Sequence, residues 1–420
     1  MIRGIKGVKD IPPDQIPKWH LVESAARSLA QRYGFREIRI PIFEPTELFV
    51  RSIGGATDIV EKEMYTFPDR DGSSLTLRPE GTAGVVRAFI ELGLAQSFPS
   101  RKLYYIGPMF RHERPQAGRF RQFHQFGVEA IGSTSPLADV EVIALLWRFF
   151  SALQLPGLSL ELNSLGQSAD RQNYKSSLIT FLEGIETALC ENCVRRMTSN
   201  PLRVLDCKVP GCRIATQEAP KILEYLSSES KNHFDQVLTA LQSLAIPYVL
   251  NPRLVRGLDY YCLTTFEVSC SALGAQNAIG AGGRYDGLFE ALDGKPTPAV
   301  GFAVGLERVI LALPDSMVPP ISPWVFVAAF GDQGSREGLQ MLEALRANGI
   351  PAETDYNSAS LKTLLRAADR LGAPFALILG DDEVTNNQAI LRNMQTKEQE
   401  ILPLTTTVSI LSSRFAGPDQ

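Results

Sequence analysis

The hydrophobic and polar positions along the chain change their period several times, and these changes divide it into predicted elements. Residues 18–33 have apolar residues at helical spacing, which predicts an amphipathic helix ending before Gly34. A strand, FREIRIPIF, follows, and residues 80–94 predict another helix. The runs LYYIGPMFRHE and RQFHQFGVEAIG predict two more strands, joined by the loop RPQAGR. Strands that pair over long sequence distances, with helices on one side, predict an α+β core on an antiparallel sheet.

Two later segments have different patterns. Residues 167–245 are polar with helical periodicity and contain four of the six cysteines, which predicts a helical insertion in the core. The stretch PDSMVPPISP has four prolines in ten residues and predicts a stiff linker. Beyond it, WVFVAAF, PAETDY and PFALILG alternate with helical segments, which predicts a small α/β domain with a parallel or mixed sheet. We therefore expect one domain at 1–320 and a second at 324–420.

The stretch RGLDYYCLTTFEV, which begins at Arg256, predicts a strand with an unusually polar face. Alternation would place Asp259, Tyr261 and Glu267 on one face and Tyr260 on the other. The first face is too polar for a layer of a hydrophobic core. We expect it to form the floor of a polar pocket, with Arg256 at its rim.

Composition narrows the class of protein. With 420 residues, 44% hydrophobic and 21% charged, the chain is typical of a globular protein of two or three domains. MIRGIKGVKDIPPDQ lacks the apolar core of a secretory signal, no apolar run is long enough to span a bilayer, and six cysteines are too few for a disulfide scaffold. We therefore expect a cytoplasmic protein that does not enter a membrane. The net charge of −4 argues against general binding to polyanions.

A local basic region departs from that negative balance. Residues 101–121 contain six arginines or lysines and one acid, Glu113, which leaves a net charge of +5. Guanidinium groups bind phosphate through paired hydrogen bonds. The chain has no G-x-x-x-x-G-K-[ST] loop and no G-x-G-x-x-G turn between a strand and a helix. A nucleotide would therefore be held by arginines on a sheet.

Four stretches combine such arginines with carboxylates and phenols: RPEGT, FRHERPQAGRFRQFHQFGVE, RGLDYY and GFAVGLER. Each stretch alone has an ordinary explanation. An arginine in a strand is usually solvated or paired, GFAVGLER fits a tightly packed helix start, and GAGGRYDGL fits a hairpin turn with Gly282 and Gly283 at positive φ. Together they indicate a site for a phosphate-rich ligand beside a small molecule that is cationic or donates hydrogen bonds.

These stretches resemble the motifs of the class II aminoacyl-tRNA synthetases. FRHE and the basic loop after it resemble their motif 2, and YGFREIRIPIFE with the helix before it resembles motif 1, with Pro41 as its proline. GFAVGLER resembles motif 3, with Ala303 where the pattern often has glycine. LVRGLDYY and GAGGRYDGL resemble the two signature peptides of the histidyl-tRNA synthetases, which are far more specific than the class motifs. The resemblance covers nearly the whole chain.

The resemblance implies a fold and a reaction. A class II catalytic core with a helical insertion would precede an anticodon-binding domain. The enzyme would activate L-histidine with ATP to histidyl-adenylate, transfer the histidine to the 3′ end of tRNA(His), and release AMP and pyrophosphate. Its partners would be histidine, ATP with Mg²⁺, tRNA(His) and a second copy of the chain in a homodimer.

The resemblance also implies a role for each matched residue. The catalytic residues, which contact the α-phosphate, would be Arg256 and Arg111. ATP would be held by Arg111, Glu113 and Arg308. The acceptor end of tRNA would lie near Gln116 and Arg119. Histidine would be bound by Glu80, Thr82, Gln125, Glu129, Tyr260, Tyr261 and Tyr285. Within that last set the imidazole would be read by Glu129 and Tyr261.

The four cysteines of the predicted insertion leave two explanations open. Their spacing, C-x2-C-x13-C-x4-C, is close to that of an all-cysteine zinc site. The residues are Cys190, Cys193, Cys207 and Cys212. Four reduced thiols in a helical insertion remain the favoured explanation over a structural zinc, because the catalysis that the resemblance implies does not need this metal.

A basic stripe in the second predicted domain also has two possible explanations. In SASLKTLLRAADRLG, Lys362, Arg366 and Arg370 recur every four residues, opposite a face of leucine and alanine. A solvated face is the favoured explanation, and direct contact with RNA is the alternative.

Three other classes of protein fit the sequence less well. The synthetase-like regulatory subunits of ATP phosphoribosyltransferase typically lose the signature residues and the last domain, but Arg111, Arg256 and Arg308 are present here. A synthetase for another amino acid would not carry RGLDYY and GGRYDGL. A protein that only binds RNA does not explain Glu80 and Glu129 beside the arginines.

Overall fold

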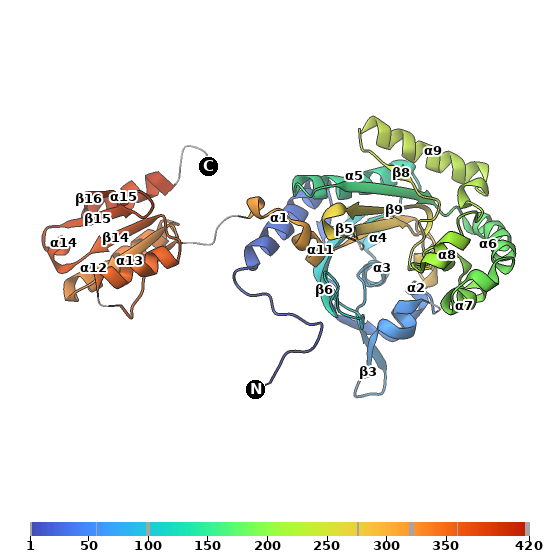
Figure 1. The fold of residues 1–420 in the computed structure, drawn as a ribbon, viewed down its shortest axis with the longest axis horizontal. Coiled ribbons are helices and arrows are strands. Elements are labelled where there is room, and N and C mark those ends of the chain that lie inside the picture. Colours follow the sequence, from blue (N-terminus) through green and yellow to red (C-terminus); the bar gives the residue numbers. More distant parts are fainter. Residues whose placement is uncertain are drawn as a thin grey trace. The chain divides into compact units, whose positions relative to one another are not determined.

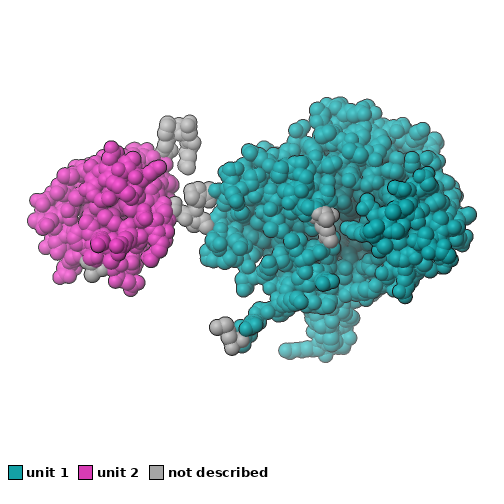
Figure 2. Space-filling model, in the orientation of Figure 1, with its two compact units in different colours: residues 1–318 teal, residues 319–420 magenta. Residues whose placement is uncertain are grey.

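A computed structural model describes residues 2–55, 57–97, 101–274, 277–318, 323–358 and 360–415. The chain folds into two compact units, Met1–Val318 and Pro319–Gln420 (Figures 1 and 2). The predicted linker and domain boundary fall partly on residues 319–322, which lie outside the described residues. Each unit is therefore described by itself.

An eight-stranded sheet forms the centre of the first unit. Its order is β1-β5-β6-β11-β10-β9-β7-β8. The strands are β1 (Arg36–Glu37), β5 (Lys102–Phe110), β6 (Gln122–Ile131), β7 (Leu158–Ser164), β8 (Val249–Leu250), β9 (Cys262–Cys270), β10 (Ala278–Arg284) and β11 (Ala299–Gly305). The six central strands pair antiparallel, whereas β1 and β8 pair parallel at the two edges. The predicted α+β core on an antiparallel sheet is confirmed.

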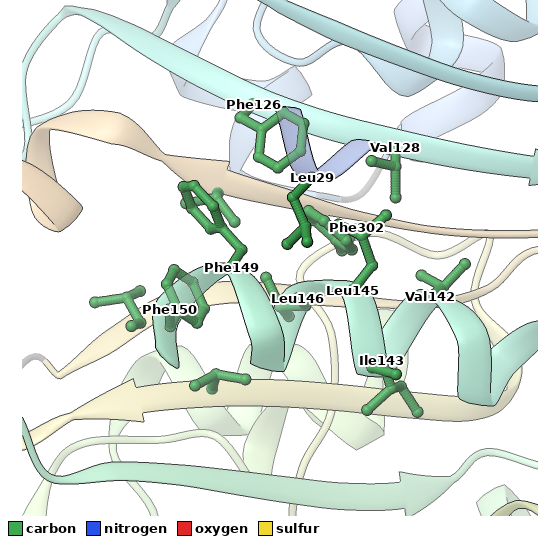
Figure 3. Packing of buried hydrophobic residues seen from close by; sticks show 14 of the residues in the cluster. Leu29, Phe126, Val128, Val142, Ile143, Leu145, Leu146, Phe149, Phe150 and Phe302 are labelled. Carbon is green, nitrogen blue, oxygen red and sulfur yellow. The ribbon is translucent and has the colours of Figure 1, made fainter. Parts of the chain in front are cut away.

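Helix α5 (Pro136–Ala152) covers one face of this sheet with its apolar side. Ser135 caps the first turn by accepting a hydrogen bond from Leu137 N at 3.3 Å. Phe126 of β6 meets Phe149 of α5 and Phe302 of β11 edge to face, with ring centroids 5.3 and 5.5 Å apart (Figure 3). Each fully buried phenylalanine stabilises the fold by about 2–3 kcal/mol. The hydrophobic layer therefore fixes which face of the sheet remains for polar groups.

The other helices of the first unit surround this layer. Helices α1 (Ile16–Arg32), α9 (Ser228–Ser243) and α11 (Leu306–Ala312) contribute to the same core, and α9 lies beside α5 (Figure 1). The remaining helices outside the insertion are α2 (Thr46–Ile53), the π-helix Ile59–Glu63, α3 (Thr82–Glu91), α4 (Leu94–Ser97), α10 (Leu288–Ala291) and the short 3₁₀ turns Ser271–Leu273 and Asp315–Met317. Among the described residues, no helix combines the length and the apolar character needed to cross a membrane.

The predicted insertion at 167–245 is helical. Its long helices are α6 (Ser168–Glu183) and the already described α9. Between them lie α7 (Glu191–Ser199), α8 (Pro210–Ala215) and the 3₁₀ turns Glu186–Ala188, Pro201–Val204 and Ile222–Glu224. These short helices pack around a small hydrophobic cluster that includes Tyr174, Cys193 and Cys212.

The predicted strand FREIRIPIF is interrupted. Only β1 joins the large sheet, and β2 (Phe43–Pro45) instead pairs with β4 (Ser74–Leu77), which also pairs with β3 (Tyr65–Pro68). The side chain of Arg78 interrupts the strand. Its Nη1 atom donates hydrogen bonds to the carbonyl oxygens of Ile40 and Pro41, at 2.7 and 3.2 Å, where a neighbouring strand would otherwise pair. Pro41 also has no N–H for a ladder.

The strand predicted to begin at Arg256 begins instead at Cys262. The residues before it form a loop, and Leu263 has φ of 45°, a left-handed conformation that interrupts regular alternation. Tyr260 and Tyr261 were predicted on opposite faces, but their rings pack together with centroids 4.6 Å apart. The prediction was wrong because a period of two requires extended backbone at every position.

Gly282 and Gly283 do not form a turn. Both lie within β10, and their φ angles are outside the left-handed region. A Cβ at Gly282 would lie 2.1 Å from Gly301 O on the neighbouring strand, and one at Gly283 would lie 2.9 Å from Tyr261 Cδ1. The glycines therefore allow the neighbouring strand and loop to pack closely, and they do not form a hairpin turn.

The second unit is a five-stranded sheet with helices on it. Its order is β13-β12-β14-β15-β16; the first three strands are parallel and the last two pairings are antiparallel. The elements are β12 (Val325–Ala329), α12 (Asp332–Ala347), β13 (Ala352–Glu353), α13 (Leu361–Arg370), β14 (Phe375–Leu379), α14 (Asp381–Thr385), β15 (Gln388–Asn393), β16 (Gln399–Pro403) and α15 (Leu404–Phe415). The sheet is mixed, and Lys362, Arg366 and Arg370 are exposed on α13.

A buried ion pair joins the large sheet to α5. Arg284, at the end of β10, and Asp139 are both 0% exposed, and Arg284 Nε donates to Asp139 Oδ1 at 3.0 Å. Arg284 Nη1 also donates to Ser133 O at 2.8 Å, and His233 Nε2 of α9 lies 2.8 Å from Asp139 Oδ2. The pair thereby fixes the end of β10 against the helix layer.

Replacing Asp139 by alanine should destabilise the first unit by about 3–5 kcal/mol, because Arg284 would remain charged in the core with only the half-buried Asp286, 3.2 Å from its Nη1, as a counter-charge. Thermal melting followed by near-ultraviolet circular dichroism measures the effect. Asp315→Ala, which breaks an exposed ion pair with Lys18 at 2.8 Å, is the control and should leave the melting temperature nearly unchanged. Equal melting of the two variants would contradict the weight given to the buried pair.

Candidate active site

The carboxyl group of Glu129 is the centre of a buried polar cluster. Because side chains alternate along β6, Glu129 points away from Phe126 and the α5 layer. Its side chain is 1% exposed. Thr82 Oγ1, in the first turn of α3, donates to Glu129 Oε1 at 2.8 Å, and the hydroxyl of Tyr285 donates to Oε2. Three segments that are far apart in the sequence thus meet at one carboxyl group.

Burial raises the pKa of Glu129 to about 8. The hydrogen bonds from Tyr285 and Thr82 lower that pKa by favouring the charged form, and the nearby Glu80 raises it again. The carboxyl group is therefore mostly protonated at pH 7 in the free protein. A basic ring bound against it could exchange a proton with it.

Glu80 and Gln125 lie next to this cluster and offer oxygen acceptors. Glu80 caps α3, accepting from Thr82 N at 2.7 Å and from Ala83 N at 2.8 Å. Burial raises the pKa of Glu80, and those backbone hydrogen bonds oppose the rise. Gln125 is 7% exposed, and its Oε1 has no hydrogen-bond partner among the described residues. A ligand that donates hydrogen bonds, such as an amine, would satisfy this atom.

Three tyrosines cover one side of the cluster. The ring of Tyr260 packs against Tyr261, and its centroid lies 5.7 Å from that of Tyr285. Burial raises the pKa of all three phenols, so each is neutral at pH 7. A neutral phenol can both donate and accept, which suits recognition of a small polar ligand.

Arg256 lies beside the tyrosines of this cluster. It lies on the loop before β9, and its Nη1 donates to Glu267 Oε2 of that strand at 2.9 Å. Its guanidinium carbon is 5.7 Å from the centroid of the Tyr261 ring. Burial lowers the pKa of Arg256, but Tyr261 and Glu267 raise it by more, so the net pKa is raised. The guanidinium is thus a fixed positive charge beside the phenols.

Arg111 and its neighbours form the cationic side of the site. Arg111 follows β5, and its Nε donates to Pro79 O at 2.8 Å, just ahead of Glu80. Glu113 Oε1 is 4.0 Å from Arg111 Nη1, and its Oε2 is 3.2 Å from Arg119 Nη1. One carboxylate is therefore shared by two guanidinium groups, which leaves net positive charge for an anionic ligand.

Arg308 lies against the loop that joins β5 and β6. A Cβ on Gly118 would lie 3.1 Å from Arg308 Cγ, so glycine permits this contact. Burial lowers the pKa of Arg308, and the charge of Arg119 lowers it further. Gln116 is exposed on the same loop, where its backbone pairs with that of Arg119 at 3.0 and 3.1 Å. The structure therefore brings together the predicted residues of all four stretches.

Sequence analysis missed Tyr105, and it placed Glu267 on a polar face without identifying its partner. Tyr105 lies buried between Gly81 and Gly127, where a Cβ on either glycine would come within 2.3 Å of its ring. Its hydroxyl has no hydrogen-bond partner among the described residues. Glu267 pairs with Arg256 although 11 positions separate them. In the sequence, only Gly81 and Gly127 hint that a large side chain packs closely there. The pairing of β5 with β6 and the position of α3 show that this side chain is Tyr105.

The four cysteines of the insertion come together away from this site. Their Sγ atoms all lie within 4.8 Å of one another. Cys193 and Cys212 are buried, and Cys190 and Cys207 are half-buried. Among the described residues, this is the cluster of thiol, imidazole or carboxylate groups with the geometry to hold a metal ion.

Two family models match this chain. The family model described as "Histidyl-tRNA synthetase" matches residues 7–309, and the model described as "Anticodon binding domain" matches residues 325–414. The two matches fall on the first and second compact units, respectively.

Individual relatives match over almost the full chain. A histidine–tRNA ligase from Desulfatibacillum aliphaticivorans is 52% identical over 408 residues, which cover 96% of this chain and 97% of the relative. One from Syntrophotalea carbinolica is 49% identical over 416 residues, 99% of each chain. Among solved structures, the apo histidyl-tRNA synthetase of S. aureus has a TM-score of 0.82 and 38% identity, covering 98% of this chain and all of that one.

Glu129→Gln should flatten the pH dependence of stability between pH 5 and pH 8. In the folded protein the pKa of Glu129 is raised from 4.5 to about 8, so the folded state binds the extra proton. The resulting stability is fully present below the lower pKa and is lost as pH rises through the higher one, at up to about 1.4 kcal/mol per pH unit.

Urea unfolding at unit pH steps measures this slope. The surface variant Glu290→Gln is the matched control and should follow the wild type. If Glu129→Gln and the wild type lose stability in parallel as the pH rises, the raised pKa of Glu129 is contradicted.

Proposed function

The chain belongs to the histidyl-tRNA synthetase family, and from this membership we infer that it attaches histidine to tRNA in a reaction driven by ATP. Its fold is that of a class II synthetase with a C-terminal anticodon-binding domain. Relatives about half identical over nearly the full length are histidine–tRNA ligases, which decides against the regulatory-subunit alternative. The first step joins histidine to AMP, and the second transfers it to tRNA.

The observation that carries this proposal is the buried acid and phenol cluster directly beside fixed arginines. We propose that Glu129 and Tyr261 read the two nitrogens of the imidazole ring. An analogue that lacks either nitrogen would leave a buried polar group unpaired, which supports discrimination of roughly 10⁴-fold or more. The α-amino group would meet the oxygens of Glu80, Thr82 and Gln125. Tyr260 and Tyr285 would line the pocket.

The arginines would stabilise the activation step. The histidine carboxylate attacks the α-phosphorus, the bond to pyrophosphate breaks, and negative charge builds on the phosphate oxygens. Arg256 and Arg111 would hold that charge without rearranging, Arg308 would hold the γ-phosphate, and Glu113 would face the adenine side. No protein nucleophile is needed, because orientation and charge suffice.

Mg²⁺ would accompany ATP, as is general for class II synthetases. This ion prefers oxygen ligands and is usually bound through phosphates and one or two carboxylates. Glu113 and Glu267 are the carboxylates in contact with the site's arginines, so the donor set fits. When bound, the ion would neutralise part of the phosphate charge.

The transfer step would use the loop between β5 and β6 and the second unit. Gln116 and Arg119 are exposed on that loop, on the cationic side of the site. The second unit matches the anticodon-binding family model, which supports a contact with tRNA far from its acceptor end. We propose tRNA(His) as the acceptor because the relatives that match over nearly the full chain are histidine–tRNA ligases.

We also propose a homodimer that works in the cytoplasm. Ile42, Phe43 and Phe67 are 45%, 55% and 40% exposed on and beside the three-stranded sheet. This segment resembles motif 1, and exposed apolar groups gathered on one sheet mark a protein interface. The six cysteines without disulfides are consistent with a reducing compartment.

ATP–pyrophosphate exchange with each of the twenty amino acids tests the activation step. We expect exchange with histidine alone, and we expect Arg256→Ala to lower kcat by about 10²- to 10³-fold, because a fixed charge on the transition state is lost. Arg346→Ala, on the surface of the second unit, is the control and should leave exchange unchanged. Exchange with another amino acid, or with none, would refute the proposed substrate.

Arg119→Ala should slow the transfer step more than the activation step. In single turnovers of preformed histidyl-adenylate with tRNA, we expect a loss of roughly tenfold or more, since one charge-assisted contact to the nucleic acid disappears. Arg114→Ala, in the same loop and also exposed, is the matched control for the charge change. Equal transfer rates for the two variants would remove Arg119 from the acceptor site.

A further inference from the structure

The four cysteines between α6 and α9 have the geometry of a metal site. The Sγ atoms of Cys190 and Cys207 are 3.9 Å apart, and no pair among the four exceeds 4.8 Å. Thiolates bound tetrahedrally to zinc at about 2.3 Å from the ion lie about 3.8 Å from each other. Cys190 N also donates to Cys212 Sγ at 3.1 Å, which is the kind of backbone contact that supports a metal-bound thiolate.

The local fold explains why these thiols meet. Cys190 caps α7, Cys193 lies in its first turn, and Cys212 lies in α8. Both helices are shorter than ten residues, and a helix of that length is not stable by itself in water. We call residues 190–216 the cysteine module. Small modules of this kind are commonly stabilised by a structural metal, because the free energy of metal binding then contributes to the free energy of folding.

This module holds one side of the loop that carries Arg256. Arg253, three residues before Arg256, donates to Thr216 O at 2.6 Å, to Thr216 Oγ1 at 2.7 Å and to Leu205 O at 3.2 Å. Thr216 in turn donates to Cys212 O through both its N–H and its hydroxyl, at 3.0 and 2.8 Å. Arg253 is thus anchored to segments that begin within a few residues of the cysteines.

The module also holds the other side of the same loop. Asn200, at the end of α7, donates from Nδ2 to Asp259 Oδ1 at 2.8 Å. Arg196 of the same helix donates to Asp58 Oδ2 at 2.9 Å, and Arg203 lies 3.7 Å from that atom. Asp259 N donates to Ile53 O at 3.2 Å. The loop therefore lies between the cysteine module and the segment around α2.

We propose that Cys190, Cys193, Cys207 and Cys212 bind one structural zinc ion, and that this ion positions the Arg256 loop through Arg253 and Asn200. Binding replaces four S–H bonds by four Zn–S bonds and releases the protons to solvent. The alternative of four free thiols leaves the meeting of all four sulfurs without a role. The positioning part rests on the function proposed for Arg256, whereas the zinc site itself does not.

The metal is tested first, without substrates. Full-length protein purified without chelators should contain about one zinc per chain, and anaerobic replacement by Co²⁺ should give the absorption of a tetrahedral cobalt–thiolate centre. Cys193→Ser and Cys212→Ser should lose the ion. Cys270→Ser is the matched control, because this buried cysteine lies outside the cluster and its side chain donates to Pro156 O at 3.1 Å, a bond that serine can retain. Wild-type protein that binds neither zinc nor cobalt would overturn the proposal.

The positioning role is tested by removing the ion and, separately, its link to the loop. Both Cys212→Ser and Arg253→Met should lower kcat of histidine-dependent exchange on the order of 10- to 100-fold with a smaller change in KM for histidine, and Arg253→Met should keep its zinc. Residues 251–261 should exchange amide hydrogens faster in both variants. Unchanged kcat and unchanged hydrogen exchange after zinc loss would overturn the positioning role.

The two proposals fail in different ways. If the wild type contains zinc but shows no exchange with histidine, the proposed function fails and the zinc site stands. If it exchanges histidine but contains no zinc under any condition, the function stands and the site is refuted.

Discussion

The buried carboxyl group of Glu129 constrains the rest of the first unit. A carboxyl group that is 1% exposed is tolerated only when its hydrogen bonds are satisfied, so Thr82 and Tyr285 must be held in place around it. Thr82 depends on the start of α3, and Tyr285 follows Arg284, which the buried pair with Asp139 fixes. The helix layer on one face of the sheet thereby sets the geometry of the polar groups on the other.

The positive charges are arranged by different means. Arg111 is held by a carbonyl oxygen beside Glu80. Arg256 pairs with Glu267 of β9, and its loop is also hydrogen-bonded to the helical insertion through Arg253 and Asp259. Glycines allow the loop and strands to approach one another, since a Cβ at Gly283 would touch Tyr261. An antiparallel sheet without a phosphate-binding helix can therefore bind a nucleotide if its loops are fixed well enough to hold guanidinium groups in place.

The sequence predicted the elements better than their contacts. Helical spacing predicted both ends of α1 to within two residues, and apolar runs predicted β5 and β6, because the backbone of those segments is regular. Alternation failed before Cys262, where the chain forms a loop, and again at Leu263, whose left-handed conformation leaves no trace in composition. Tyr105 was missed because its role depends on two glycines that meet it only in three dimensions. The roles assigned to the site residues came from the motif resemblance, and the structure supplies the reason why they lie together.

The carboxyl group of Glu129 is the group that we propose binds the imidazole ring of histidine. Calorimetric titration of histidine, and separately of ATP, into wild-type protein and Glu129→Gln tests it most directly. We expect the variant to lose histidine affinity on the order of 10²-fold or more, because an amide cannot exchange a proton with the ring, while ATP affinity changes little. Equal histidine affinity in the two proteins would contradict it.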